Sequence, residues 1–382
     1  MTNITRVLRD LVALPSQNPM GRPLSGPDYF EYQVTAYLEN FFRDLNVEHL
    51  RQPLAPLREN MVARFESPGS SRTLLWEVHQ DTVPAANMTI DPYGGHIENG
   101  RLYGRGACDV KGGMAAMLTA FGRLVREQPR NAASVVLACV VDEEFTFTGI
   151  QELVRRGVKA DFAVVAEPTR LAIVNAHKGV VRWHLETRGR ACHSSSPEQG
   201  VNAIYRMAAV LAGIERFAAE LRVSRVDPSL GPATMSVGRI DGGVSVNVVP
   251  EWCRIEIDRR LVGGEDPSAA PGELENYLRE NCGIAGTFVT LPPWMAMTAL
   301  SPKGSEEAVA ALGSAIHAIR GNHEVISVPY GTDAATLAAG GVPSVVFGPG
   351  DIAKAHTCDE WVSLDQVEQA SEILYHLAVA SS

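Results

Sequence analysis

The chain has 382 residues, 45% of them hydrophobic, and a formal net charge of −10. This composition is typical of a soluble globular protein, and the length is more than one compact domain usually holds. The acidic balance argues against nucleic acid or an anionic membrane surface as the main partner.

Cysteine usage and the N-terminal segment both favour a reducing compartment. None of the six cysteines forms a C-x-x-C pair, so neither a cysteine zinc knuckle nor a disulfide framework is indicated. The first residues, MTNITRVLRDLVALPSQNP, carry charges within their apolar stretch and lack the cleavage site of a signal peptide. No apolar run approaches the length of a membrane span. We therefore expect a cytoplasmic protein with no membrane partner.

The first part of the chain alternates between helical and strand patterns. An amphipathic helix opens it, and Pro15 ends that helix. A second helical pattern, with 3.6-residue spacing, runs over 114–125. Strand-like runs lie at 61–66, 73–79, 134–141 and 162–166. Strands that alternate with helices in this way predict an α/β fold, with a mostly parallel sheet covered by helices on both faces.

The pattern changes over residues 177–293. A strand, a helix, two strands, a helix and a strand are predicted there, at 180–187, 200–221, 233–240, 251–262, 270–281 and 286–291. This βαββαβ order is that of a ferredoxin-like sandwich.

The α/β style returns after the insertion, with a buried strand at 344–347 and a closing helix at 364–379. We therefore predict a catalytic domain in two parts, 1–176 and 294–382. Residues 177–293 are predicted to form a smaller inserted domain between them.

The strand over 73–79 ends on a polar cluster, His79-Gln80-Asp81. Side chains two apart on a strand share a face, so His79 and Asp81 would point the same way and Gln80 would not. That geometry suits a metal ligand and its orienting carboxylate, although such a pair more often marks a capped strand end.

Other predicted strands end on acidic or histidine residues as well. Glu143-Glu144 and Glu167 directly follow buried strands, and His356 follows the last strand. Asp109 lies between a glycine-rich turn and a helix. Ligands bind at the carboxyl ends of strands in open α/β sheets, so these residues are expected to converge. Nitrogen and carboxylate ligands without thiolate suit a catalytic zinc pair.

The motifs HQDTVP, GRGACDVKGG, DEE, AEPT, HSSSPEQGVNAI, NVVP…RR and GTDA resemble, in order, those of the zinc aminoacylase and carboxypeptidase family. That family includes acetylornithine deacetylases, succinyl-diaminopimelate desuccinylases and glutamate carboxypeptidases. The stretches AEPT…AHKG, HSSSPEQGVNAI and GPGDIAKAH look closest to the acetylornithine deacetylases. The chain departs from the family at Val78, where glycine is usual, and we expect this to affect packing rather than ligation.

The resemblance implies five metal ligands. His79 and Glu167 would hold one zinc ion, Glu144 and His356 the other, and Asp109 would bridge the two. Cobalt or manganese could substitute, because metal affinity follows availability as well as ligand type.

The resemblance also implies three catalytic residues. Asp81 would orient His79, and Glu143 would be the general base that moves a proton from water to the leaving amine. His193 would reach the neighbouring subunit's site and stabilise the oxyanion, which implies a homodimer built through the inserted domain.

Substrate-binding roles carry over to Asn247, Arg260, Gly331 and Thr332. Arg260 would hold the substrate carboxylate, a task that suits a guanidinium making two parallel hydrogen bonds.

Several nearby residues have simpler interpretations. Arg259 is expected to be a charge on the solvent face of its strand, and Cys108 a small buried filler. A structural hinge role is expected for His177 and Lys178.

The function these residues imply is hydrolysis of the amide bond of an N-acyl amino acid. The alternative on the same scaffold is a succinyl-diaminopimelate desuccinylase or a glutamate-type carboxypeptidase or dipeptidase. A binding protein that only retained the fold would not need five ligands and a base. No motif identifies the acyl group or the amino acid.

Overall fold

The computed structural model describes residues 3–284 and 286–381, which form two compact units. Among the described residues, the first comprises those up to Asn175, Ser301–Ser327 and those from Thr332 onward, and the second comprises those between Ala176 and Leu300 together with Val328–Gly331. The domain limits at residues 177 and 293 stay predictions, since compactness alone does not define an independently folding domain.

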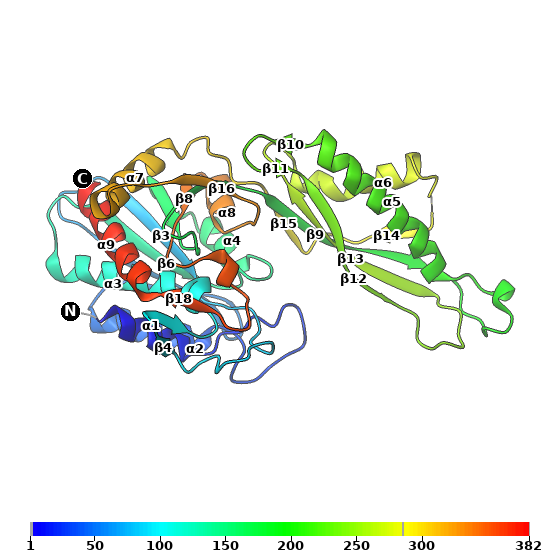
Figure 1. The fold of residues 1–382 in the computed structure, drawn as a ribbon, viewed down its shortest axis with the longest axis horizontal. Helices are drawn as coiled ribbons and strands as arrows, with labels where there is room; N and C mark the ends of the chain where they lie inside the picture. Colours follow the sequence, from blue (N-terminus) through cyan, green and yellow to red (C-terminus); the bar gives the residue numbers. More distant parts are fainter. Residues whose placement is uncertain (1–2, 285, 382) are drawn as a thin grey trace. The chain divides into compact units, whose positions relative to one another are not determined.

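The first unit is built on an eight-stranded sheet with the order β1-β2-β6-β3-β7-β17-β8-β16. Figure 1 labels β3, β6, β8 and β16 of this sheet. Its strands are β1 (His49–Ala55), β2 (Arg58–Phe65), β3 (Thr73–His79), β6 (Ser134–Val140), β7 (Phe162–Val165), β8 (Ile173–His177), β16 (Val325–Val328) and β17 (Ser344–Val346). The four central strands, β6, β3, β7 and β17, run parallel, whereas β1, β2 and β8 pair antiparallel. Parallel strands are buried on both faces, which explains the continuous apolar runs of β3 and β6.

Helices cover both faces of this sheet. One face shares a single core with α1 (Ile4–Val12), α2 (Tyr32–Asp44), α3 (Gly112–Glu127), α7 (Glu306–Arg320) and α9 (Leu364–Ala380). The helices α4 (Thr148–Arg155) and α8 (Ala334–Ala339) contact the sheet, but their buried residues do not belong to that core, which places both helices on the other face. The predicted α/β class is confirmed, and Pro15 lies just past the first helix as expected.

A small three-stranded sheet, with the order β18-β5-β4, flanks this unit. Its strands are β4 (His96–Glu98), β5 (Arg101–Tyr103) and β18 (Trp361–Ser363), and Trp361 pairs with Tyr103. This pairing brings the segment after β5 next to the segment before β18, although the two are about 250 residues apart in sequence.

The second unit has the predicted ferredoxin-like order. It contains β9 (Gly179–Arg188), α5 (Ala203–Ser224), β12 (Thr234–Gly242), β13 (Trp252–Leu261), α6 (Ala270–Glu280) and β14 (Phe288–Thr290). Its sheet has the antiparallel order β12-β13-β9-β14, and β15 (Met295–Met297) also pairs with β9. A short ribbon of β10 (Val226–Asp227) and β11 (Gly231–Pro232) follows α5. The βαββαβ prediction is therefore confirmed.

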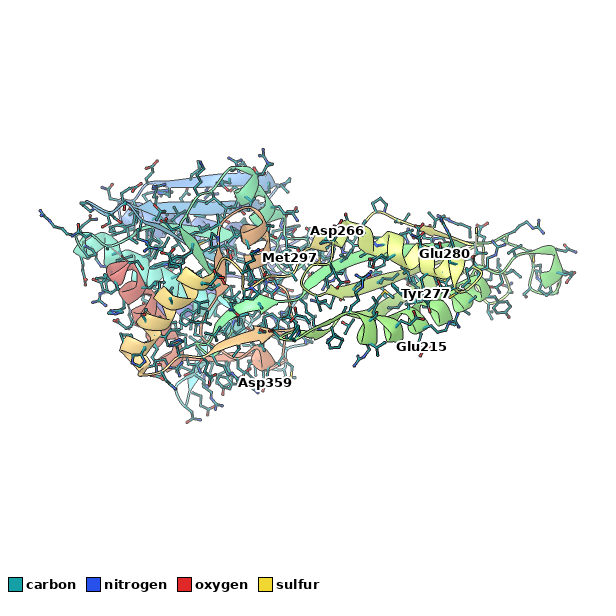
Figure 2. All side chains as sticks on the ribbon, turned by 90° about the horizontal axis from the view of Figure 1, so that it is seen from above. Glu215, Asp266, Tyr277, Glu280, Met297 and Asp359 are labelled. Atoms are coloured by element: carbon teal, nitrogen blue, oxygen red, sulfur yellow. The ribbon has the colours of Figure 1, made fainter. Side chains whose placement is uncertain are left out.

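The helices α5 and α6 pack on one face of this sheet and enclose its core. Figure 2 shows the two helices side by side, with Glu215 on α5 and with Tyr277 and Glu280 on α6. The rings of Phe217 and Tyr277 join them, with centroids 4.8 Å apart.

The expectation that Arg259 lies on the solvent face is wrong. Burial alternates along β13, and Arg259 falls on the same face as Ile255 and Ile257, which the helices cover. Its guanidinium is 1% exposed and pairs with the carboxylates of Glu265 and Glu273, both at 2.7 Å. Two acidic partners therefore compensate a charge that the strand alternation buries.

Within the part of the chain that the structure describes, no helix is both long enough and apolar enough to span a bilayer.

Candidate metal centre

Three adjacent central strands end next to one another on the same edge of the large sheet. His79 is the last residue of β3, Glu143 and Glu144 lie just past the end of β6, and Glu167 lies just past β7. Because these strands are parallel neighbours, their carboxyl ends bring the four side chains to one place. The predicted convergence is therefore a consequence of strand order.

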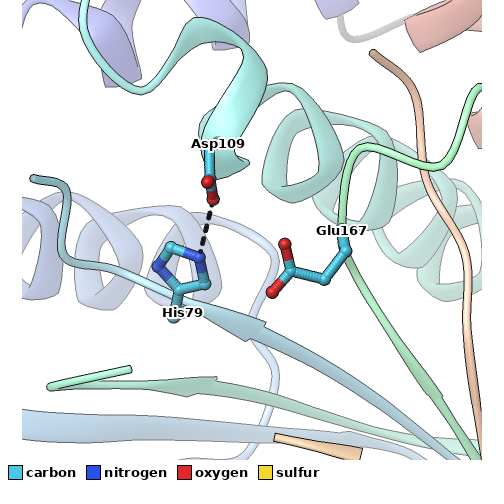
Figure 3. Close-up of side chains that lie close together, drawn as sticks. All are labelled: His79, Asp109 and Glu167. Carbon is cyan, nitrogen blue, oxygen red and sulfur yellow. Dashed lines mark hydrogen bonds and ion pairs between the residues drawn. The ribbon is translucent and has the colours of Figure 1, made fainter. Parts of the chain in front are cut away.

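His79, Asp109 and Glu167 form a first buried cluster, in which one ligand atom from each residue lies within 4.8 Å of the others. The Nε2 atom of His79 lies 3.1 Å from Oδ1 of Asp109 (Figure 3). Gly348, in the loop after β17, allows that loop to pack closely against the backbone of Glu167. A Cβ at position 348 would lie 2.6 Å from the carbonyl oxygen of Glu167.

Asp109, Glu144 and His356 form a second cluster under the same 4.8 Å limit. The Nε2 atom of His356 lies 3.2 Å from Oδ2 of Asp109 and 3.3 Å from Oε2 of Glu144. Asp109 therefore directs one carboxylate oxygen toward each cluster, as a bridging ligand would.

The donors of both clusters fit divalent cations. Each cluster offers one imidazole nitrogen with carboxylate oxygens and no thiolate, a combination that catalytic zinc sites use. The Oε1 atom of Glu144 is buried and has no hydrogen-bond partner among the described residues. A buried polar atom without a partner is costly, and a bound cation would satisfy it.

The pKa shifts reveal an excess of negative charge at this site. Burial raises the pKa of Glu143 and of Glu167 well above their usual range, and nearby carboxylates raise both further. Burial lowers the pKa of His356, but its hydrogen bonds to Asp109 and Glu144 outweigh that effect and raise this pKa to about 11. Two divalent cations would supply the positive charge that protons supply otherwise.

Asp81 contacts His79 mainly through its backbone. The Nδ1 atom of His79 lies 3.0 Å from the carbonyl oxygen of Asp81 and 3.7 Å from its carboxylate. The carboxylate accepts hydrogen bonds from the backbone N–H groups of Glu143, at 3.1 Å, and Glu144, at 3.2 Å. Asp81 therefore holds the turn that carries these two glutamates.

Glu143 belongs to neither ligand cluster. Its residue is 8% exposed, and its carboxyl interacts electrostatically with His79, Glu144 and Asp109. A buried carboxyl beside both clusters, but outside their ligand sets, is available for proton transfer.

His193 and Asn247 lie on paired loops of the second unit. The backbone N–H of Ser194 donates to the carbonyl oxygen of Asn247 at 3.0 Å, and a β-bridge joins His193 to Val248. Both predicted residues are exposed, and the Nδ1 atom of His193 lies 2.7 Å from the hydroxyl of Ser195.

The remaining predicted substrate residues have different surroundings. Arg260 lies on the face of β13 opposite the helices and donates from Nε to the Asp258 carboxylate at 2.8 Å. Gly331 packs against the end of Met297, and a Cβ at position 331 would lie 2.4 Å from Cε of Met297, so this methionine would have to shift. Thr332 is buried in the first unit, where its hydroxyl accepts the N–H of Ala334 at 3.2 Å.

The sequence analysis did not identify Asn18, whose side chain is hydrogen-bonded to two carboxylates next to the site. Its Nδ2 atom donates to the carboxylates of Asp81, at 2.8 Å, and Asp142, at 2.9 Å. Arg58 in turn pairs with Asp142 at 2.8 Å. A single asparagine in the loop SQNP carries no pattern that would have indicated this role.

Buried acids behind the ligands were missed as well. Glu77 and Asp333 are each 1% exposed and interact with one another, and burial raises the pKa of both. Glu360 is fully buried and accepts the backbone N–H of Asp109 at 3.0 Å. The only sequence signal for Glu360 was its position four residues after His356.

Comparison with known proteins places this site in a family. The model of peptidase family M20/M25/M40 matches residues 75–380. An acetylornithine deacetylase of Myxococcus xanthus is 33% identical over 345 residues, which cover 89% of this chain and 86% of that protein. A probable carboxypeptidase of Aspergillus clavatus is 30% identical over 382 residues, which cover 95% and 85% of the two chains.

The fold is also found in solved structures. An M20 family metallo-carboxypeptidase from Sulfolobus solfataricus superposes with a TM-score of 0.81 at 19% identity, and 99% of each chain is covered. The family model and the relative from Myxococcus xanthus show that the chain belongs to peptidase family M20/M25/M40 and is a metal-dependent hydrolase that acts on amide bonds.

Proposed function

We propose that the protein hydrolyses the amide bond of an N-acyl amino acid, in the manner of an acetylornithine deacetylase, with two zinc ions. The observation that carries this proposal is the pair of ligand clusters that share Asp109 next to the buried Glu143. The deacetylase of Myxococcus xanthus, at 33% identity, supports the choice of substrate class.

In this proposal His79 and Glu167 hold one ion, Glu144 and His356 hold the other, and Asp109 bridges them. Cobalt or manganese could replace zinc, because imidazole and carboxylate ligands accept all three. When bound, the ions polarise the substrate carbonyl and lower the pKa of water to near neutrality.

Glu143 would be the general base. Burial and surrounding carboxylates raise its pKa, which makes it a better proton acceptor than an exposed glutamate. Glu143 would take a proton from the attacking water and deliver it to the nitrogen of the leaving amine. The Asp81 carboxylate, which accepts the backbone N–H groups of Glu143 and Glu144, would hold the turn that carries Glu143 in place during both transfers.

The second unit would complete the site in a homodimer. The edge strand β12 has exposed side chains and an open hydrogen-bonding edge, which favours pairing with a second copy. The partner's His193 would stabilise the oxyanion, with Asn247 beside it on the paired loop. Arg260 would bind the substrate carboxylate, and Gly331 and Thr332 would line the same pocket.

Carboxypeptidase or dipeptidase activity is the second candidate. The relative from Aspergillus clavatus, at 30% identity over 95% of this chain, has the name of a carboxypeptidase. Succinyl-diaminopimelate desuccinylase activity is a further candidate, since desuccinylases and deacetylases of this scaffold would differ in the shape of the substrate pocket. We propose a cytoplasmic enzyme of amino-acid biosynthesis, and arginine biosynthesis in particular if acetylornithine is the substrate.

A hydrolysis panel separates these candidates. The zinc-loaded protein is incubated with acetyl-ornithine, acetyl-citrulline, succinyl-diaminopimelate, acyl-glutamates and unblocked dipeptides, and release of free amine is measured. The proposal predicts the highest kcat/KM for an acetylated amino acid. Preferential cleavage of dipeptides would contradict it in favour of the second candidate, and no cleavage of any amide would contradict both.

A further inference from the structure

Glu360 lies outside both ligand clusters, but it is bonded to the segment that carries Asp109. Its Oε1 atom accepts the backbone N–H groups of Cys108, at 2.9 Å, and Asp109, at 3.0 Å. Its Oε2 atom accepts a hydrogen bond from Nη1 of Arg105 at 2.5 Å. The glutamate is 0% exposed, so every one of these bonds is shielded from water.

The pair of Arg105 and Glu360 is itself buried, with Arg105 only 1% exposed. The guanidinium makes a further hydrogen bond to the side chain of Asn87 at 3.1 Å. Removing one member of such a pair is strongly destabilising, because it leaves the other as an uncompensated buried charge. The carboxylate therefore presents a fixed acceptor to the backbone of residues 108 and 109.

Glu360 also belongs to the segment that carries His356, another member of the second cluster. It follows His356 by four residues and directly precedes β18, which pairs with β5. Its own carbonyl oxygen accepts the N–H of Gly104 at 3.0 Å. The side chain and backbone of Glu360 thus bind the Asp109 segment and the His356 segment to one another.

The hydrogen bonds of the Glu360 carboxylate resemble those of the Asp81 carboxylate to Glu143 and Glu144. Asp81 accepts the N–H groups of Glu143 and Glu144, just as Glu360 accepts those of Cys108 and Asp109. Two buried carboxylates thus accept hydrogen bonds from the backbones of Asp109 and Glu144, and Glu360 follows His356, the third member of the second cluster, by four residues. Such supporting bonds fix ligand positions before a metal binds.

We propose that Glu360 is a positioning residue, which sets the separation of Asp109 and His356 and thereby the metal affinity of the second cluster. The inference rests on the proposed function only in that both clusters bind divalent metal. It assigns Glu360 no contact with substrate.

The test measures metal affinity rather than turnover. Wild-type protein and the E360Q variant are freed of metal and titrated with Co²⁺ and Zn²⁺ in competition with a chromophoric chelator. In E360Q, an amide N–H₂ group must face either Arg105 or the two backbone donors, so one of these contacts is lost. If Glu360 positions the second cluster, we expect one of the two binding steps to weaken about 10- to 100-fold, and more than the other.

Glu265 provides a matched control in the second unit. Its side chain is 5% exposed, pairs with the buried Arg259 and accepts the backbone N–H of Val262 at 2.7 Å. E265Q therefore removes a similar bond set where no ligand cluster lies. We expect E265Q to lower the thermal unfolding midpoint comparably while both metal affinities stay within about threefold of wild type.

Both affinities unchanged in a folded E360Q variant would overturn the proposal, and so would equal weakening in E360Q and E265Q. If E360Q does not fold, E360D serves instead, because its charge still matches Arg105 while its shorter side chain cannot reach all three donors. Normal metal affinity in E360D would likewise overturn it. A wild-type protein that binds no second ion would contradict the proposed two-metal function, and that result is visible before any variant is compared.

Discussion

The backbone N–H of Glu143 donates a hydrogen bond to the carboxylate of Asp81 over 3.1 Å. The neighbouring N–H of Glu144 donates to the same carboxylate at 3.2 Å, and Asn18 donates to it at 2.8 Å. Asp81, two positions after the proposed ligand His79, thus supports the proposed base Glu143 and the proposed ligand Glu144, which follow a different strand.

Replacing Asp81 by Asn should therefore affect turnover through Glu143. One carboxylate oxygen becomes an N–H₂ group, which cannot accept from a backbone N–H, so the turn loses part of its support. We expect kcat to fall about 10- to 100-fold with a smaller change in KM, since supporting residues of metal sites have effects of this size. Steady-state kinetics on the metal-loaded variant measure it, and a change confined to KM would contradict the assignment.

Asp109→Ala should remove more metal than the loss of any terminal ligand. The carboxylate directs one oxygen to each cluster, so its loss deprives both ions of a ligand and leaves two cations repelling without a shared anion. We expect elemental analysis to find little metal in this variant and about one ion per chain in Glu167→Ala. Two ions per chain in Asp109→Ala would contradict the bridging role.

His177 should make the protein less stable in acid. Burial lowers its pKa from the ordinary 6.5 to about 4, although the backbone hydrogen bond to Lys178 partly opposes this effect. Between these two values the unfolded chain binds a proton that the folded chain does not, so the free energy of unfolding falls as pH falls.

The variant His177→Asn removes this titration and retains a side-chain N–H donor. The acid-dependent loss of stability should shrink by no more than about 3 kcal/mol between pH 6.5 and pH 4. Denaturant unfolding of both metal-free proteins across this range measures the difference, and identical pH profiles would show that His177 does not titrate in this way.

Mixing two inactive variants tests whether His193 acts across a dimer. In a mixed dimer of Glu143→Gln and His193→Ala chains, one site has both an intact Glu143 and a partner's intact His193. Activity should return to at most about half the wild-type value per mixed dimer, and to about a quarter per dimer of an equimolar mixture after random exchange. Mass analysis confirms subunit exchange, and exchange without renewed activity would show that His193 does not act in the partner's site.

The sequence was sufficient for features that depend on local pattern. The buried strands β3 and β6 and their polar ends were predictable, because apolar runs and the residues that stop them lie side by side in the chain. The βαββαβ order followed in the same way from successive periodicities.

The supporting bonds were not predictable, because they join distant segments. Asn18 contacts Asp142 across 124 positions, and Glu360 contacts Asp109 across 251. The spacing of His79 and Asp81 indicated a shared face, but it could not indicate that the backbone of Glu143 would occupy the Asp81 carboxylate. The error at Arg259 has a related cause, since the acidic partners that compensate its burial lie on other elements.

The central claim is that Glu143 moves the proton while other residues hold two metal ions. The direct measurement is turnover and metal content of Glu143→Gln in the same preparation, with acetyl-ornithine or the best substrate of the panel. We expect about two ions per chain, as in the wild type, and a fall in kcat of at least about 100-fold, the usual contribution of a general base. Near wild-type turnover with both ions bound would contradict the account.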